Sequence, residues 1–120
     1  MSKKILYIED DKILGSAFKI KMSGTDYEVQ HAGSVEEAEK LNDFVADVLL
    51  VDHGLPGKQG IDAIPDLKKI FPQAKIIIYS NFDDDKHIEK AQQNGADDYW
   101  VKFQTPIKKV IQQIQAILTN

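Results

Sequence analysis

Three carboxylates, a hydroxyl and a lysine close or follow four of the short apolar runs of this chain. They are Glu9, Asp10, Asp52, Ser80 and Lys102. A carboxylate at the end of a buried strand is costly unless it meets solvent or a cation. A hard divalent cation with oxygen ligands, such as Mg²⁺, relieves the repulsion among several carboxylates. With a lysine and a hydroxyl beside it, such a set could receive a transferred phosphoryl group, with a carboxylate as the nucleophile.

The apolar runs predict the strands that must position these side chains. Five runs read as strands, at 3–8, 27–32, 47–52, 74–80 and 97–102. Segments with helical spacing begin near Lys12, Ser34, Gly60, Asp83 and Pro106. Strands that are apolar almost throughout and alternate with helices indicate a parallel sheet covered on both faces. We therefore expect one doubly wound α/β domain over residues 1–120, with its site outside the carboxyl ends of the strands.

The overall composition is that of an ordinary globular domain. Of the 120 residues, 42% are hydrophobic and 28% are charged, and the formal net charge is −4. An acidic chain lacks the basic face that nonspecific nucleic-acid binding needs. No apolar stretch is long enough to span a membrane, and the absence of cysteine excludes disulfides. We expect a cytoplasmic protein with no nucleic-acid or membrane partner.

Four stretches together resemble a known family over essentially the whole chain. "KKILYIEDD", "LLVDHGLPGKQG", "IIIYS" and "GADDYWVK" are similar to the receiver domain of bacterial two-component response regulators, and most of all to single-domain, chemotaxis-type regulators. The resemblance implies a flavodoxin-like fold: a five-stranded parallel sheet in the order 2-1-3-4-5, flanked by five helices.

The resemblance also implies a role for each residue at the predicted rim. The phosphoacceptor falls on Asp52. The Mg²⁺ ligands fall on Glu9, which would act through water, on Asp10, on Asp52 and on the backbone carbonyl of Gly54. A partner phosphohistidine, on a sensor histidine kinase or a histidine phosphotransfer protein, would supply the phosphoryl group.

Three further roles follow from the same resemblance. Lys102 would pair with the phosphoryl group, Ser80 would follow it, and Tyr99 would be the switching aromatic residue. Phosphorylation would then change the binding of a downstream protein whose identity the sequence does not give. In this reading the protein is no enzyme apart from catalysing its own phosphorylation and dephosphorylation.

The chain departs from the family pattern beside the expected site. Phe103 follows Lys102 where the family has a proline joined by a cis peptide bond, and a cis bond before another residue costs about 3 kcal/mol. We therefore expect a trans bond, with Lys102 displaced or mobile in the unphosphorylated protein. Asn81 adds a polar side chain after Ser80, and His53 stands where an apolar residue is usual. We expect His53 to be packed or hydrogen-bonded rather than a ligand.

Two other functions compete with the phosphoacceptor hypothesis. A degenerate receiver would signal by protein contact without phosphorylation, which Phe103 and Asn81 favour and the complete acidic set disfavours. A Mg²⁺-dependent phosphatase or phosphotransferase acting on a small molecule would need a general acid near Asp52. The residue two positions further on is Gly54, which cannot supply one.

Several other residues have local structural explanations. We expect Asp11 to cap the helix that follows it, and we expect the run 83–85 to cap the fourth helix rather than to form a second metal site. Asn94-Gly95 should end that helix, which has few apolar residues and should be loosely anchored. The apolar residues of the segment 13–22 cover about 200° of a helix, wider than one core face requires, so part of that surface should be exposed.

Overall fold

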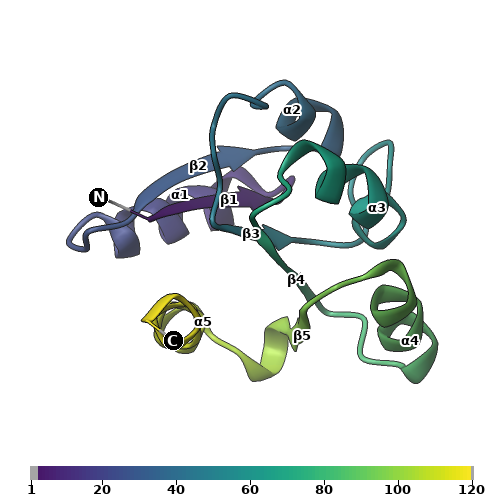
Figure 1. Ribbon diagram of the computed structural model, residues 1–120. Helices are drawn as coiled ribbons and strands as arrows, with labels where there is room; N and C mark the ends of the chain where they lie inside the picture. The colour runs from purple at the N-terminus through teal and green to yellow at the C-terminus, as the bar shows by residue number, and fades with distance from the viewer. Residues whose placement is uncertain (1–2, 120) are drawn as a thin grey trace.

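The computed structural model describes residues 3–119 and contains one parallel sheet of five strands. The strands are β1 (Lys4–Ile8), β2 (Glu28–Ala32), β3 (Val48–Val51), β4 (Lys75–Ser80) and β5 (Asp98–Val101). They run side by side in the order β2-β1-β3-β4-β5 (Figure 1). The predicted fold class and strand order are therefore confirmed.

Helices cover both faces of this sheet. They are α1 (Lys12–Met22), α2 (Val35–Glu39), α3 (Gly60–Ile70), α4 (Asp85–Asn94) and α5 (Ile107–Thr119), with a short 3-10 helix η1 (Lys102–Gln104) before α5. Helices α1 and α5 lie on one face, and α2, α3 and α4 lie on the other (Figure 1). Among residues 3–119, no helix combines the length and the hydropathy that crossing a membrane requires.

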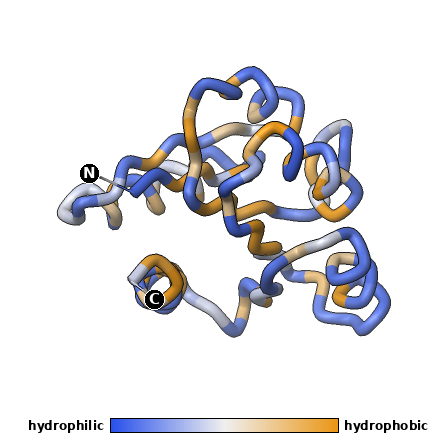
Figure 2. Tube along the Cα trace, viewed as in Figure 1, coloured by the Kyte–Doolittle hydropathy of each residue, from blue (hydrophilic) through white to orange (hydrophobic). Residues whose placement is uncertain are grey.

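Alternating side chains of each strand supply two separate hydrophobic cores. On β1, Leu6 and Ile8 face the core under α2, α3 and α4, whereas Ile5 and Tyr7 face the core under α1 and α5. All four residues of β3 are buried, and hydrophobic residues concentrate along β3 and β4 in the middle of the sheet (Figure 2). Burial on both faces explains why these runs are apolar almost throughout rather than alternating.

Side-chain caps begin the helices that flank the rim. The carboxylate of Asp11 accepts hydrogen bonds from the first turn of α1, at 2.9 Å from the nitrogen of Ile13, and Asp84 caps α4 in the same way. Gly95 ends α4 with a positive φ of 105°, a conformation that favours glycine. Ala91 is the one fully buried residue of α4. The predicted caps are thus confirmed, and α4 contributes little to the core, as expected from its few apolar residues.

Part of the apolar surface of α1 faces solvent, as its wide apolar arc predicts. Ile13 is 80% exposed and Ile20 is 71% exposed, whereas Phe18 and Met22 are buried against the sheet. The helix therefore uses one part of its apolar arc for the core and leaves the rest uncovered.

The start of α3 packs directly against the backbone that follows β3. A Cβ atom added to Gly60 would lie 1.9 Å from the carbonyl oxygen of Asp52, closer than any real contact. Glycine at this position lets the helix approach the strand end, which sets the direction of the loop between them.

Replacing Gly60 with alanine should therefore destabilise the protein by about 2 kcal/mol or more, because a backbone group must move to admit the methyl group. The measurement is urea unfolding of Gly60→Ala. Gly24→Ala is the matched control, because a Cβ there meets nothing within 4 Å. Equal stability of the two variants would contradict the close approach of α3 to the end of β3.

Candidate metal and phosphoacceptor site

The acidic residues at the rim directly continue two central strands. The backbone N–H of Glu9 donates to the carbonyl of Ala32 at 2.9 Å, and that of Asp52 donates to the carbonyl of Ile8 at 3.0 Å. The sheet therefore holds both residues beyond the last paired positions of β1 and β3. Glu9 is 1% exposed and Asp52 is 7% exposed, whereas Asp10 faces solvent.

Three carboxylates from these two strand ends come together. One carboxylate oxygen from each of Glu9, Asp10 and Asp52 lies within 4.8 Å of those of the other two. A cluster of oxygen donors without nitrogen or sulfur suits a hard cation such as Mg²⁺ rather than zinc or copper. The predicted acidic cluster is therefore present, and its donor set fits the expected metal.

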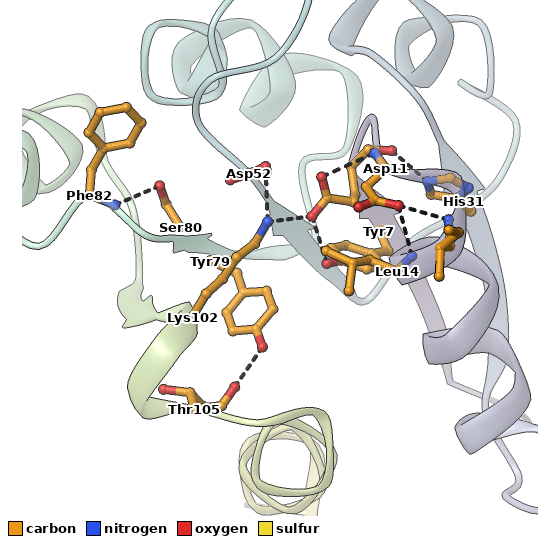
Figure 3. Close-up of polar contacts among 12 residues, drawn as sticks. Tyr7, Asp11, Leu14, His31, Asp52, Tyr79, Ser80, Phe82, Lys102 and Thr105 are labelled. Carbon is orange, nitrogen blue, oxygen red and sulfur yellow. Dashed lines mark hydrogen bonds and ion pairs between the residues drawn. The ribbon is translucent and has the colours of Figure 1, made fainter.

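Lys102, the first residue of η1 directly after β5, lies between the two buried members of the cluster. The ammonium of Lys102 contacts Glu9 Oε1 and lies 3.1 Å from Asp52 Oδ2 (Figure 3). Its nitrogen also lies 5.8 Å from the centre of the Tyr79 ring. The predicted convergence of the lysine on the acidic rim is confirmed.

The prediction for the turn after Lys102 is half right. The Lys102–Phe103 peptide bond is trans, as expected. The expectation that Lys102 would be displaced is wrong, because its ammonium already lies on the two carboxylates. The alternative expectation, that Lys102 is mobile, stays a prediction. The 3-10 helix η1 turns the chain without a cis bond and leaves the Phe103 side chain 64% exposed.

Burial and charge shift the titration of the clustered groups in different directions. Burial raises the pKa of Asp52 to about 7, and the charge of Glu9 adds to the rise while Lys102 opposes it. Burial also acts to raise the pKa of Glu9, but the hydrogen bond and charge of Lys102 hold it below its usual value. Burial acts to lower the pKa of Lys102, yet both carboxylates keep it raised. Lys102 therefore stays charged and pairs mainly with an ionised Glu9.

Glu9 has further hydrogen-bond partners that the sequence analysis missed. The Tyr7 hydroxyl donates to Glu9 Oε1 at 3.1 Å, and the backbone N–H of Asp11 donates to Oε2 at 3.3 Å. The ring of His31 donates from Nε2 to the backbone carbonyl of Glu9 at 2.6 Å. Tyr7 stands two residues before Glu9 on one strand, which places both side chains on the same face. That spacing was the one signal that could have revealed the contact.

The loop after Asp52 is held by a glutamine that the sequence analysis also missed. The Gln59 side chain accepts the backbone N–H groups of Gly54 and Leu55 at 2.7 and 3.1 Å, and it donates to the Leu55 carbonyl at 2.8 Å. Gly54 has a φ of 86°, which explains why glycine occupies this position. The loop is therefore a defined turn, and the metal-ligand role expected of the Gly54 carbonyl stays a prediction.

Ser80 and Tyr99 lie beside the rim but use other partners. The buried hydroxyl of Ser80 accepts the backbone N–H of Phe82 at 3.2 Å (Figure 3). The hydroxyl of Tyr99 donates to the carbonyl of the same Phe82. Both predicted switch residues are thus tied to one segment, 80–82. Their switching roles stay predictions.

His53 is packed and hydrogen-bonded, as expected. Its Nδ1 accepts the backbone N–H of Ile61 at 3.2 Å, and its ring meets the edge of Phe82 at 5.4 Å between centres. His87 from α4 stacks on Phe82 with ring centres 4.5 Å apart. This small aromatic cluster joins the loop after β3 to the loop after β4.

A doubly wound sheet with an acidic cluster and a lysine outside its carboxyl ends defines a receiver fold. The family model described as the response regulator receiver domain matches residues 5–115. The chain therefore belongs to the receiver domains of two-component response regulators.

Known proteins of similar sequence and structure agree with this assignment. The chemotaxis protein CheY of Thermotoga maritima is 31% identical over 112 residues, covering 92% of this chain and 93% of that protein. The oxygen regulatory protein NreC of Staphylococcus aureus is 32% identical over 103 residues, covering 82% of this chain but only 48% of NreC. A CheY-like receiver domain structure from Methanospirillum hungatei JF-1 has a TM-score of 0.90 at 23% identity, covers 99% of this chain and 95% of that one, and shares the fold.

The raised pKa of Asp52 predicts how stability depends on pH without metal. Because the folded protein holds this proton more tightly than the unfolded chain, the contribution of Asp52 to stability is fully present below about pH 4 and is lost as the pH rises through about 7. Between pH 5 and pH 8, wild type should lose about 2 kcal/mol relative to Asp52→Asn, whose amide oxygen can still accept from Lys102. The measurement is urea unfolding in EDTA.

Asp11→Asn is the control for this comparison, because it removes one carboxylate from an exposed position and asparagine still caps a helix. Its stability should follow wild type across the same pH range. If Asp52→Asn also ran parallel to wild type from pH 5 to pH 8, the burial argument for Asp52 would be wrong.

Proposed function

We propose that this receiver domain accepts a phosphoryl group on Asp52 from a phosphohistidine of a partner protein. The observation that carries the proposal is the joint placement of a nearly buried Asp52, two further carboxylates and the Lys102 ammonium at one rim. The partner would be a sensor histidine kinase or a histidine phosphotransfer protein. The transfer would change the binding of a downstream protein.

The proposed reaction forms one bond and breaks one bond at phosphorus. An oxygen of the ionised Asp52 carboxylate attacks the phosphorus atom, the P–N bond breaks, and its electron pair returns to the departing imidazole. In the unphosphorylated protein the Lys102 ammonium contacts Glu9 and Asp52. After the transfer it would pair with the new phosphoryl oxygens, where the negative charge then lies. The burial of Asp52 limits the access of water to the acyl phosphate.

The acidic cluster supports Mg²⁺ as the partner of this step. The carboxylates of Glu9, Asp10 and Asp52 would hold the ion together with the Gly54 carbonyl. A bound Mg²⁺ would supply positive charge that offsets the repulsion among the carboxylates and the charge on the phosphoryl oxygens.

The segment 80–82 supports a switching role for Ser80 and Tyr99. For Ser80 to reach a phosphoryl group on Asp52, its hydroxyl must leave the backbone N–H of Phe82. The Tyr99 hydroxyl donates a hydrogen bond to the carbonyl of Phe82, so a shift of this segment would also break or move that hydrogen bond and change the position of the Tyr99 ring. Phosphorylation at Asp52 would in this way reach β5 and the surface around α4.

Incubation with acetyl phosphate and Mg²⁺ should add one phosphoryl mass to the wild-type protein, and intact-mass spectrometry is the measurement. The label should be absent from Asp52→Asn and should be suppressed by EDTA. Lys102→Ala should slow labelling, since within residues 3–119 Lys102 is the side-chain cation that forms an ion pair with Asp52.

Two results would overturn the phosphoacceptor proposal. One is a label that persists in Asp52→Asn. The other is a wild-type protein that takes no label from either acetyl phosphate or a phosphorylated histidine phosphotransfer protein, which would favour the contact-only receiver.

Mg²⁺ should stabilise the folded protein because only the folded chain assembles the acidic cluster. At 100 times its dissociation constant, the ion would add about 2.7 kcal/mol, enough to raise the melting temperature by several degrees. Asp10→Ala should remove most of this rise in a thermal unfolding experiment. Asp11→Ala is the control, since it removes a helix cap and lowers the melting temperature but should keep the response to Mg²⁺. An equal loss of response in the two variants would contradict the assigned ligands.

A further inference from the structure

We propose that Tyr7 is a positioning residue for the metal site: its hydroxyl fixes the Glu9 carboxylate in the orientation in which it faces the divalent cation. The inference rests on the proposed function, because it assumes that Glu9 serves a bound cation. It concerns a tyrosine of the apolar core to which the family pattern assigns no role.

Glu9 needs such a contact more than the other two carboxylates do. Glutamate has one more rotatable bond than the two aspartates of the cluster, so holding its carboxylate in one place costs more conformational entropy. Its backbone is fixed by the hydrogen bonds to Ala32 and from His31. Beyond the backbone, its side chain is held by the Tyr7 hydroxyl, by Lys102 and by a longer bond from the N–H of Asp11.

Of the two side-chain partners, Tyr7 is the more deeply buried. Its side chain is 2% exposed, and its ring centre lies 5.0 Å from that of Phe18 and 6.4 Å from that of Tyr79. Figure 3 shows the Tyr7 ring beneath the cluster of contacts at the rim, between α1 and the side chain of Tyr79. A tyrosine hydroxyl can only donate to a carboxylate, so the packed ring directs one donor at Glu9 Oε1.

Lys102 alone cannot hold the Glu9 carboxylate in one orientation. Its ammonium divides its contacts between Glu9 and Asp52, and the proposed reaction draws it toward the phosphoryl group. The Tyr7 hydroxyl bonds to Glu9 and has no partner in the reaction. It therefore keeps the Glu9 carboxylate in place whichever group Lys102 contacts.

The test is the affinity of the unphosphorylated protein for Mg²⁺, measured by isothermal titration calorimetry with MgCl₂. Tyr7→Phe keeps the packed ring and removes the hydroxyl, so the Glu9 carboxylate is freed without a cavity in the core. The affinity for Mg²⁺ should fall about 10-fold. This is the lower end of the loss expected when a metal-ligating side chain loses a hydrogen-bond partner.

Tyr79→Phe is the matched control. It also removes a hydroxyl from a buried tyrosine of the same core, but that hydroxyl donates to the carbonyl of Thr105 and not to Glu9. Its Mg²⁺ affinity should stay within twofold of wild type, even if both variants lose similar thermal stability. In the near-ultraviolet difference spectrum, addition of Mg²⁺ should shift a tyrosine band of wild type and of Tyr79→Phe, and this shift should be missing from Tyr7→Phe.

The possible outcomes separate this inference from the proposed function. If wild type binds no Mg²⁺, the proposed metal site fails, and the role of Tyr7 fails with it. If wild type binds Mg²⁺ and Tyr7→Phe binds it equally well, the proposed function stands and the inference is overturned. An equal loss of affinity in Tyr79→Phe would also overturn it, because the effect would then come from a general loosening of the core.

Discussion

A single ammonium group between two buried carboxylates is the interaction on which the site depends. Glu9 and Asp52 lie beyond the ends of β1 and β3, where burial makes two neighbouring negative charges expensive. Lys102 reaches them from the start of η1, directly after β5, and in the sheet order β4 lies between β3 and β5. The long side chain of lysine spans this distance, with its nitrogen above the ring of Tyr79. The ion pair thus connects strands that are not neighbours and fixes the spacing of the rim.

The departures from the family pattern lie around this interaction without breaking it. Phe103 is directed into solvent, and Asn81 is exposed after the end of β4. His53 turns its ring toward Phe82 and the N-terminal part of α4, and its Nδ1 accepts from α3. The chain therefore changes what surrounds the acidic cluster and how the two nearby loops are connected, while the carboxylates and the lysine keep their places.

The elements of the fold could be predicted because each depends on local sequence. A strand buried on both faces must be apolar throughout, as 48–51 is, and Asp11 and Gly95 mark helix ends through local backbone geometry. The convergence of the acidic residues followed from one topological fact, that parallel strands end at the same edge. The strand order and the individual roles came from the family resemblance rather than from the residues alone.

Contacts that depend on packing in three dimensions could not be read from the sequence. Gln59 looks like any polar loop residue until its side chain is seen to hold the turn at Gly54. His31 touches Glu9 because Gly15 leaves room for its ring: a Cβ there would lie 2.4 Å from the imidazole. The expected displacement of Lys102 was wrong because a local argument about one peptide bond omitted the attraction of two buried carboxylates.

The Glu9–Lys102 contact joins residues 93 positions apart and has a consequence for biosynthesis. During translation, β1, β2 and β3 leave the ribosome well before β5. Until β5 pairs with the edge of the sheet, no lysine lies between the carboxylates of Glu9 and Asp52. Their mutual repulsion then opposes the close approach of these two side chains. The Glu9–Lys102 ion pair can therefore form only after Lys102 has been synthesised, and a chain halted before β5 carries the acidic residues without this lysine.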